Sequence, residues 1–227
     1  MLLPYFSPGW FFGYDIILEL LFAVALLFIV IFAHKVYKTT TQRSVQIFGI
    51  GLTLMMISYI VQSIFNILTI YELQNNISFL SKAQYYLIFQ FLGTYSHIIL
   101  MNIGLVLILY MTFKVENIKI LLTILAVSLF AIFTYDFPFY LFTVFATIYL
   151  VFISLYFIKN YINNRSKKTL IVAIAFIFIL LANAHFIFSI NHQIFYVIGH
   201  ILELIAYLFI LWNFILVRRY DKKKRKT

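Results

Sequence analysis

Five ionisable side chains lie inside long apolar stretches of the chain, where an ionisable group is costly unless it has a function or a partner. They are Glu19, His97, His185, His200 and Glu203. Each lies between 15 and 18 residues from the basic residue that borders its own stretch. Along a helix this spacing is about 22–27 Å. The sequence therefore predicts that the five side chains share one depth in a membrane.

These residue types suit a metal ion. His200 and Glu203 are three residues apart, so in a helix they lie on one face and can reach the same ion. The chain has no cysteine, which leaves imidazole and carboxylate as the usual ligands for a transition metal. We predict a Zn, Fe or Mn site near the extracytoplasmic face. The polar partners expected to support its ligands are Asn183, Asn102 and Gln62.

Other uses of the same residues compete with this prediction. They could form a proton or cation relay in a small transporter or channel. They could hold haem b between two histidines, with Gly93 and Gly199 allowing the ring to approach closely. They could also be a hydrogen-bonded network that only holds helices together, or belong to a sensor or assembly subunit. A membrane-embedded metal-dependent hydrolase or oxidase is not favoured, and a retinal Schiff base is not expected because residues 202–212 contain no lysine.

The composition indicates the elements that must position these residues. Of 227 residues, 64% are hydrophobic and 11% are charged, and the mean hydropathy is +1.02. Soluble domains average about 45–50% apolar and about 25% charged residues, so the chain is expected to be an all-helical, multi-pass membrane protein. The apolar runs predict seven transmembrane helices in a single domain over 1–217. They lie near 14–34, 45–71, 84–113, 118–135, 138–158, 169–190 and 194–217.

The basic residues predict the orientation. Sixteen of the seventeen lie in alternate loops or in the tail, and Lys82 is the exception. Because lysine and arginine stay on the cytoplasmic side, the N-terminus is expected outside and the C-terminus inside a plasma membrane. The tail, 218–227, is expected to anchor the chain to an anionic inner leaflet rather than to bind nucleic acid. Its basic residues are Arg218, Arg219, Lys222, Lys223, Lys224, Arg225 and Lys226.

Residues near the expected outer surface are predicted to have simpler roles. Asp15 and Asp136 are expected to be solvated, and His34 and His192 are expected to lie outside the central site. The longest loop is predicted over about 72–83. Aromatic side chains mark the same outer boundary, as aromatic belts do in other membrane proteins. They are Trp10, Phe11, Phe12, Tyr85, Tyr86, Tyr135, Tyr140 and Tyr196.

Two stretches share a local pattern. Ile88-Phe89-x-x-Leu92-Gly93 in the third span matches Ile194-Phe195-x-x-Ile198-Gly199 in the seventh. Spans one to three and five to seven are also expected to run in the same directions. The sequence therefore allows a 3+1+3 parallel duplication, with chance similarity in a chain rich in Phe and Ile as the alternative.

Overall fold

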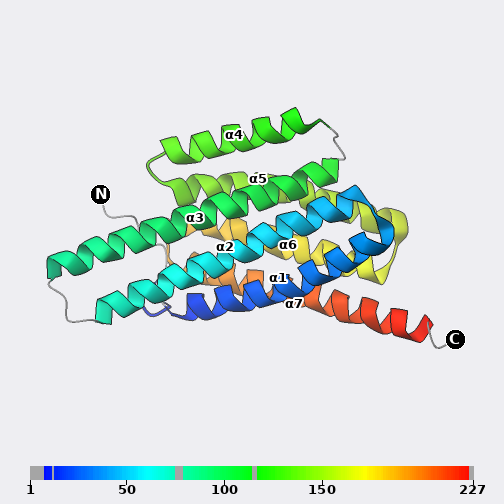
Figure 1. Ribbon diagram of the computed structural model, residues 1–227, viewed down its shortest axis with the longest axis horizontal. Coiled ribbons are helices and arrows are strands. Elements are labelled where there is room, and N and C mark those ends of the chain that lie inside the picture. Colours follow the sequence, from blue (N-terminus) through cyan, green and yellow to red (C-terminus); the bar gives the residue numbers. More distant parts are fainter. Residues whose placement is uncertain (1–7, 12, 75–78, 114–116, 225–227) are drawn as a thin grey trace.

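The structure is a computed structural model that describes residues 8–11, 13–74, 79–113 and 117–224. The described part of the chain folds into seven α-helices (Figure 1). Their bounds are α1 Tyr14–Thr40, α2 Arg43–Gln74, α3 Phe79–Phe113, α4 Ile118–Thr134, α5 Pro138–Asn164, α6 Lys167–Phe188 and α7 Ile194–Lys224. The all-helical prediction is confirmed.

Six of the helices are long and apolar enough to cross a membrane, as expected for a multi-pass membrane protein. The remaining helix, α4, has 17 residues and is shorter than the others. Its length of about 25 Å falls below the roughly 30 Å of a bilayer's hydrocarbon core. It still runs beside α3 and α5 and returns the chain to the end of the bundle where α3 began (Figure 1).

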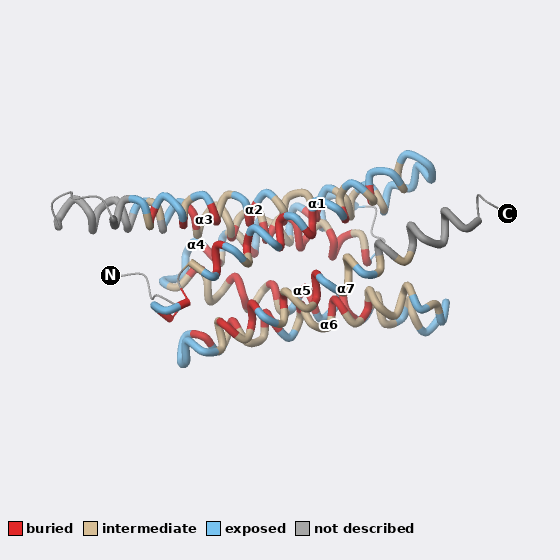
Figure 2. The backbone as a smooth tube through the Cα atoms, turned by 90° about the horizontal axis from the view of Figure 1, so that it is seen from below, coloured by how far each residue is buried: buried red, intermediate tan, exposed pale blue. Residues whose placement is uncertain are grey.

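The helices form two groups of three. α1, α2 and α3 pack in chain order into one layer, and α5, α6 and α7 pack into another (Figure 2). The layers meet along two seams, where α1 contacts α7 and α3 contacts α5. α4 contacts α3 and α5 from outside this ring. The buried core, which includes Phe22, Ile98, Leu150 and Tyr207, lies where the two groups face each other.

Local signals explain where several helices begin and end. The side chain of Asn117 accepts a hydrogen bond from the Lys119 N–H at the start of α4, and Pro138 occupies the first turn of α5. Thr41 and Arg165 adopt left-handed conformations after α1 and α5. Their N–H groups donate to carbonyls of the preceding turn, so that these helices stop and the chain reverses.

The structure corrects the predicted loop at 72–83. α2 continues to Gln74 and α3 begins at Phe79, so most of that segment is helical. These two helices extend beyond the rest of the bundle at one end (Figure 1). The side chains of Lys82, Tyr85 and Tyr86 lie outside the described residues. The same holds for the side chains of the basic tail from Arg218 onward, although the α7 backbone continues to Lys224. The membrane orientation, the choice of membrane and the lipid-anchoring tail stay predictions.

A pair of glycines lets α2 and α3 pack closely. A Cβ atom added at Gly51 would lie 2.9 Å from the carbonyl oxygen of Gly104, and one added at Gly104 would lie 2.8 Å from that of Gly51. Backbone oxygens cannot move aside as a flexible side chain can. Small residues at such crossings are typical of helix pairs in membranes. This contact fixes α2 against α3, and these helices carry part of the site described below.

We expect Gly104→Ala to lower the stability of the protein in detergent. The added methyl group forces the two helices apart, and overpacking of this kind costs about 1–3 kcal/mol. Thermal unfolding followed by tryptophan fluorescence measures the effect. Gly49→Ala is the matched control, because its added Cβ would meet only the Ala33 Cβ at 3.5 Å, an ordinary contact. Equal unfolding temperatures for the two variants would contradict the close crossing.

Candidate functional site

The centre of the site is a buried carboxyl group that joins the two helix groups. Glu203 of α7 is 2% exposed, and its Oε1 accepts a hydrogen bond from the Tyr59 hydroxyl of α2. The Tyr207 hydroxyl, one turn along α7, lies 3.3 Å from the Tyr59 hydroxyl. Glu203 and both tyrosines are fully buried. Hydrogen bonding therefore continues across the boundary between the α1–α3 group and the α5–α7 group.

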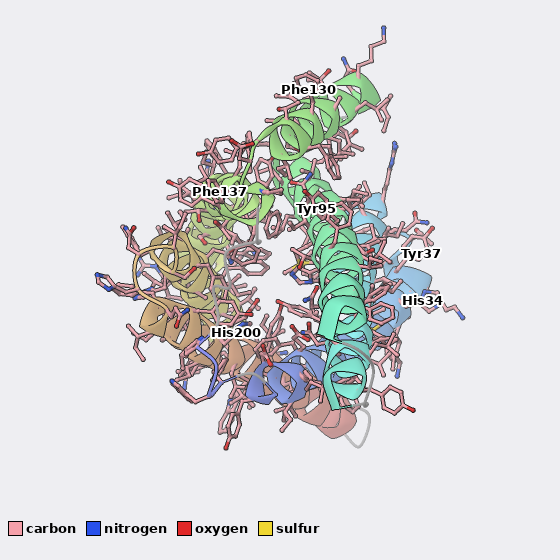
Figure 3. The ribbon with its side chains drawn as sticks, turned by 90° about the vertical axis from the view of Figure 1, so that its left-hand side faces the viewer. His34, Tyr37, Tyr95, Phe130, Phe137 and His200 are labelled. Atoms are coloured by element: carbon pink, nitrogen blue, oxygen red, sulfur yellow. The ribbon has the colours of Figure 1, made fainter. Side chains whose placement is uncertain are left out.

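His200 lies beside this carboxyl group and is surrounded by aromatic rings. Figure 3 places it toward the middle of the bundle, whereas His34 and Tyr37 lie on the outer side. Four aromatic rings surround it, with centroids 4.5–6.0 Å from that of the imidazole, contributed by Phe11, Phe22, Phe186 and Tyr196. Its Nδ1 is 3.7 Å from Glu203 Oε2, too long for a hydrogen bond. Among the described residues neither ring nitrogen has a hydrogen-bond partner.

His97 reaches the same region from α3. Its Nδ1 lies 2.7 Å from the Ser58 hydroxyl of α2, and its ring centroid is 5.5 Å from that of Tyr59. On its other side it faces Phe142 of α5, at a centroid distance of 6.4 Å. The structure therefore brings His97, His200 and Glu203 into one neighbourhood around Tyr59. We call these four residues with Ser58 and Tyr207 the central cluster.

Glu19 belongs to a separate group. It is 4% exposed on α1, and its carboxylate oxygens accept hydrogen bonds from two side chains of α2. Ser63 Oγ donates to Oε2 at 3.1 Å, and Asn66 Nδ2 lies 3.2 Å from each oxygen. Gln62 in turn donates to Asn66 Oδ1 at 3.3 Å. The prediction that Glu19 joins the histidines in one site is therefore replaced by two neighbouring groups.

The other predicted residues lie apart from both groups. His185 is half-buried, its Nδ1 lies 2.8 Å from the Leu181 carbonyl oxygen of its own helix, and its ring contacts Phe195. Asp136, His34 and His192 are exposed, in agreement with the expectation for them.

The structure corrects the prediction that Asp15 is solvated. Asp15 is 4% exposed, and its Oδ1 accepts hydrogen bonds from the Gly13 and Ile16 N–H groups. It therefore satisfies backbone donors at the start of α1, where a carboxylate is also favoured by the helix dipole. Phe11, expected in an outer aromatic belt, is likewise 5% exposed and turns inward onto His200.

The polar residues expected to support metal ligands bond elsewhere. Asn183 donates to the Ile179 carbonyl oxygen within α6, and Asn102 donates to the Ser128 hydroxyl of α4 at 2.9 Å. Gln62 bonds Asn66, as described above. Gln62 thus supports Glu19, while Asn102 ties α4 to the bundle and Asn183 stays within its own helix.

Only two of the five predicted ligands, His200 and Glu203, lie close enough together to bind one metal ion. The described residues contain no group of three or more His, Asp or Glu side chains that could hold a metal ion. Protein side chains occupy the space beside the two glycines that were expected to admit a haem ring. Gly93 packs against Phe65 of α2, and Gly199 packs against the Phe186 ring of α6. In each three-helix group, therefore, a glycine of the third helix receives a phenylalanine from the middle helix. The 3+1+3 duplication and bound haem stay predictions.

Sequence reasoning missed the polar residues of α2 other than Gln62. Tyr59, Ser63 and Asn66 recur at intervals of four and three residues, with Ser58 adjoining, and they form one polar face on an otherwise apolar helix. Tyr207 follows Glu203 by four residues and lies on the same face of α7. Because none of these side chains is ordinarily charged, a search for ionisable residues passed over them. A search for polar residues at helical spacing would have found them.

We expect His200→Phe to leave the thermal stability unchanged or to raise it. The phenyl ring suits the four surrounding rings, and it removes buried nitrogens whose lack of partners costs about 1–3 kcal/mol. His97→Phe is the matched comparison, because it takes away the partner of Ser58 and should lower stability. Thermal unfolding of both variants in one detergent measures this difference. A lower unfolding temperature for His200→Phe than for His97→Phe would contradict the arrangement.

Comparison of the chain with protein-family models, with curated proteins and with solved structures found no match.

Proposed function

We propose that the protein moves protons across the membrane through the central cluster, as a small transporter or channel. The observation that carries the proposal is the Tyr59–Glu203 hydrogen bond. It joins a buried carboxyl group to a phenol across the two helix groups, directly beside an imidazole that has no partner among the described residues. Intramembrane carboxyl and imidazole groups in such chains are typical of proton relays.

Each group in the central cluster can take part in proton transfer. A carboxyl group and an imidazole bind and release protons, and a phenol can accept one proton while it donates another. Tyr59 contacts Glu203 and Tyr207 on one side and lies against the His97 ring on the other. Hydrogen-bonded exchange partners therefore run from Glu203 and Tyr207 of α7 to Tyr59 of α2, and the His97 ring of α3 lies in contact with Tyr59.

The charge balance of the interior favours protons or cations over anions. Among the side chains that the structure describes, the buried carboxylic acids are Asp15, Glu19 and Glu203. Within the part of the chain whose side chains the structure describes, no lysine or arginine is buried. An ionised carboxylate away from water needs a compensating charge, and here a bound proton or cation would provide it. Anions would meet only repulsion at these groups.

The proposal is tested by reconstituting the purified protein in liposomes that contain a pH-sensitive dye. A pH gradient is imposed while valinomycin and equal potassium concentrations hold the membrane potential at zero. Choline replaces sodium on both sides. We expect the internal pH to change well above the rate in protein-free liposomes. Rates equal to those of protein-free liposomes under gradients of either direction would contradict proton movement.

A metal site is the second candidate, and the spacing of His200 and Glu203 favours it. Their 3.7 Å separation allows one ion to touch both atoms, since Zn–N and Zn–O distances are about 2.0–2.2 Å. Mass spectrometry of metals on protein purified without chelators or a histidine tag tests this. A near-stoichiometric transition metal that is lost in His200→Phe would support it. Metal-free protein that still moves protons would contradict the metal site and support the proton relay.

A further inference from the structure

A cavity lies between α3 and α5, at the end of the bundle where both helices end (Figure 1). Its volume is about 290 Å³, close to the lower end of the roughly 300–1,000 Å³ that is usual for small-molecule pockets. Phe113, Lys159 and Asn163 are exposed, so the cavity reaches the protein surface. Among the described residues it is lined by Thr112 and Phe113 of α3 and by Tyr156, Lys159, Asn160 and Asn163 of α5.

The α5 side chains that line the cavity share one face of that helix. Tyr156, Asn160 and Asn163 recur at intervals of four and three residues, and Lys159 adjoins them. Asn164 Nδ2 donates to Asn160 Oδ1 at 2.6 Å, which leaves the Asn160 Nδ2 group available as a donor. Among the described residues Lys159 forms no ion pair, and none of those that line the cavity is acidic. The cavity therefore offers one positive charge and several hydrogen-bond donors, which suits an anion.

The depth of the cavity in a membrane indicates which anion it meets. The uncharged stretch 138–158 of α5 is about 30 Å long as a helix, which equals the hydrocarbon thickness of a bilayer. Lys159, Asn160 and Asn163 follow this stretch, so they fall at the level of the lipid headgroups. The exposed rings of Phe113 and Phe152, with centroids 5.5 Å apart, provide an apolar surface beside the cavity. A ligand with an anionic head and an apolar body fits both parts.

We propose that this cavity binds the phosphate group of an anionic phospholipid. Basic pockets between transmembrane helices on the cytoplasmic side bind such headgroups in other membrane proteins, and the basic residues predict that this end of the bundle is cytoplasmic. Lys159 pairs with the phosphate, and Asn160 and Asn163 donate hydrogen bonds to it. The exposed rings contact the glycerol and the acyl chains. This site is distinct from the basic tail, whose attraction to an anionic leaflet needs no cavity, and from the central cluster that carries the proposed proton movement.

Native mass spectrometry of the delipidated protein in detergent tests the site. Added phosphatidylglycerol should bind more tightly than phosphatidylcholine with the same acyl chains, because the choline ammonium group is repelled by Lys159. Lys159→Gln should weaken the binding of phosphatidylglycerol about fivefold. Lys38→Gln is the matched control, because it removes an exposed lysine from the last turn of α1 that does not line the cavity. Both variants keep the basic tail, so its contribution to lipid binding is the same in each.

Asn163→Ala separates the cavity from a general attraction between positive charge and anionic lipid. It removes one donor from an exposed position and changes no charge, so binding should weaken about threefold. Equal losses in Lys159→Gln and Lys38→Gln would overturn the proposal, as would unchanged binding in Asn163→Ala or equal affinity for the two lipids. Inorganic phosphate that displaces the lipid at equal concentration would contradict the phospholipid assignment and show that the cavity takes free phosphate. Lipid binding is measured without a pH gradient, so its result is independent of proton flux.

Discussion

Liposomes that contain Glu203→Gln protein are expected to carry protons at least about tenfold more slowly than wild-type liposomes, since a positioned acid–base group typically contributes factors of about 10²–10⁴. The substitution keeps the size of the side chain and a carbonyl oxygen that can accept from the Tyr59 hydroxyl. It removes the group that binds and releases the proton. The expected result is thus a loss of flux with little loss of folded protein.

The control for this variant is Tyr110→Phe. Tyr110 is a buried residue of α3 whose hydroxyl has no hydrogen-bond partner among the described residues. Its removal perturbs the bundle interior without touching the central cluster, so flux should match that of the wild type. Glu203→Gln liposomes that keep wild-type flux, with protein amounts verified, would show that protons do not pass through this carboxyl group.

Tyr59→Phe is expected to lower both stability and proton flux. A hydrogen bond to a charged group contributes about 1.5–3 kcal/mol, and the phenyl ring cannot donate to Glu203. The ring still fills the space beside Phe22 and His97, so the packing term changes little. Thermal unfolding and liposome flux measure the two effects, with Tyr110→Phe again as the control.

A double-mutant cycle distinguishes the hydrogen bond from general damage. Tyr59→Phe removes the donor of this contact, and Glu203→Gln replaces its acidic acceptor with a weaker neutral one, so the second substitution should cost less once the first is made. The loss of flux in the double variant should therefore be close to that of Glu203→Gln alone. Additive losses in stability and flux would mean that the two side chains do not act on each other.

The helices themselves could be predicted because bilayer thickness sets a minimum length for an apolar run. Six of the seven predicted spans meet that length. α4 is the exception, because its apolar run is bounded closely by Asn117 and by the turn at Tyr135. The ends of α2 and α3 were predicted less well. The segment at 72–83 is polar enough to suggest a loop, yet most of it is helical.

The rotation of each helix about its axis could not be predicted. In a soluble bundle an apolar stripe identifies the inner face, but a helix in lipid is apolar all round. Large apolar side chains such as Leu20 and Phe130 are exposed, whereas Phe22 and Ile132 on the same helices are buried. Depth counting therefore placed His185 and Glu19 level with His200, although their side chains point to different neighbours.

The polar contacts between helices could not be predicted from the sequence either. Tyr59 and Tyr207 read as ordinary aromatic residues in a chain with 17 tyrosines, and only the folded bundle brings the Tyr59 hydroxyl of α2 to Glu203 and Tyr207 of α7. Long-range contacts of this kind depend on the order of helices around the ring. That order, with α4 outside and α7 returning to α1, cannot be derived from the seven apolar runs.

Infrared difference spectroscopy can detect whether Glu203 takes up and releases a proton inside the membrane, as we propose. Spectra of the protein in lipid are recorded while the pH is cycled, and the C=O stretching band of a protonated carboxyl group is followed. We expect a reversible band that is absent from Glu203→Gln and retained in Glu19→Gln. A spectrum unchanged by Glu203→Gln would contradict it.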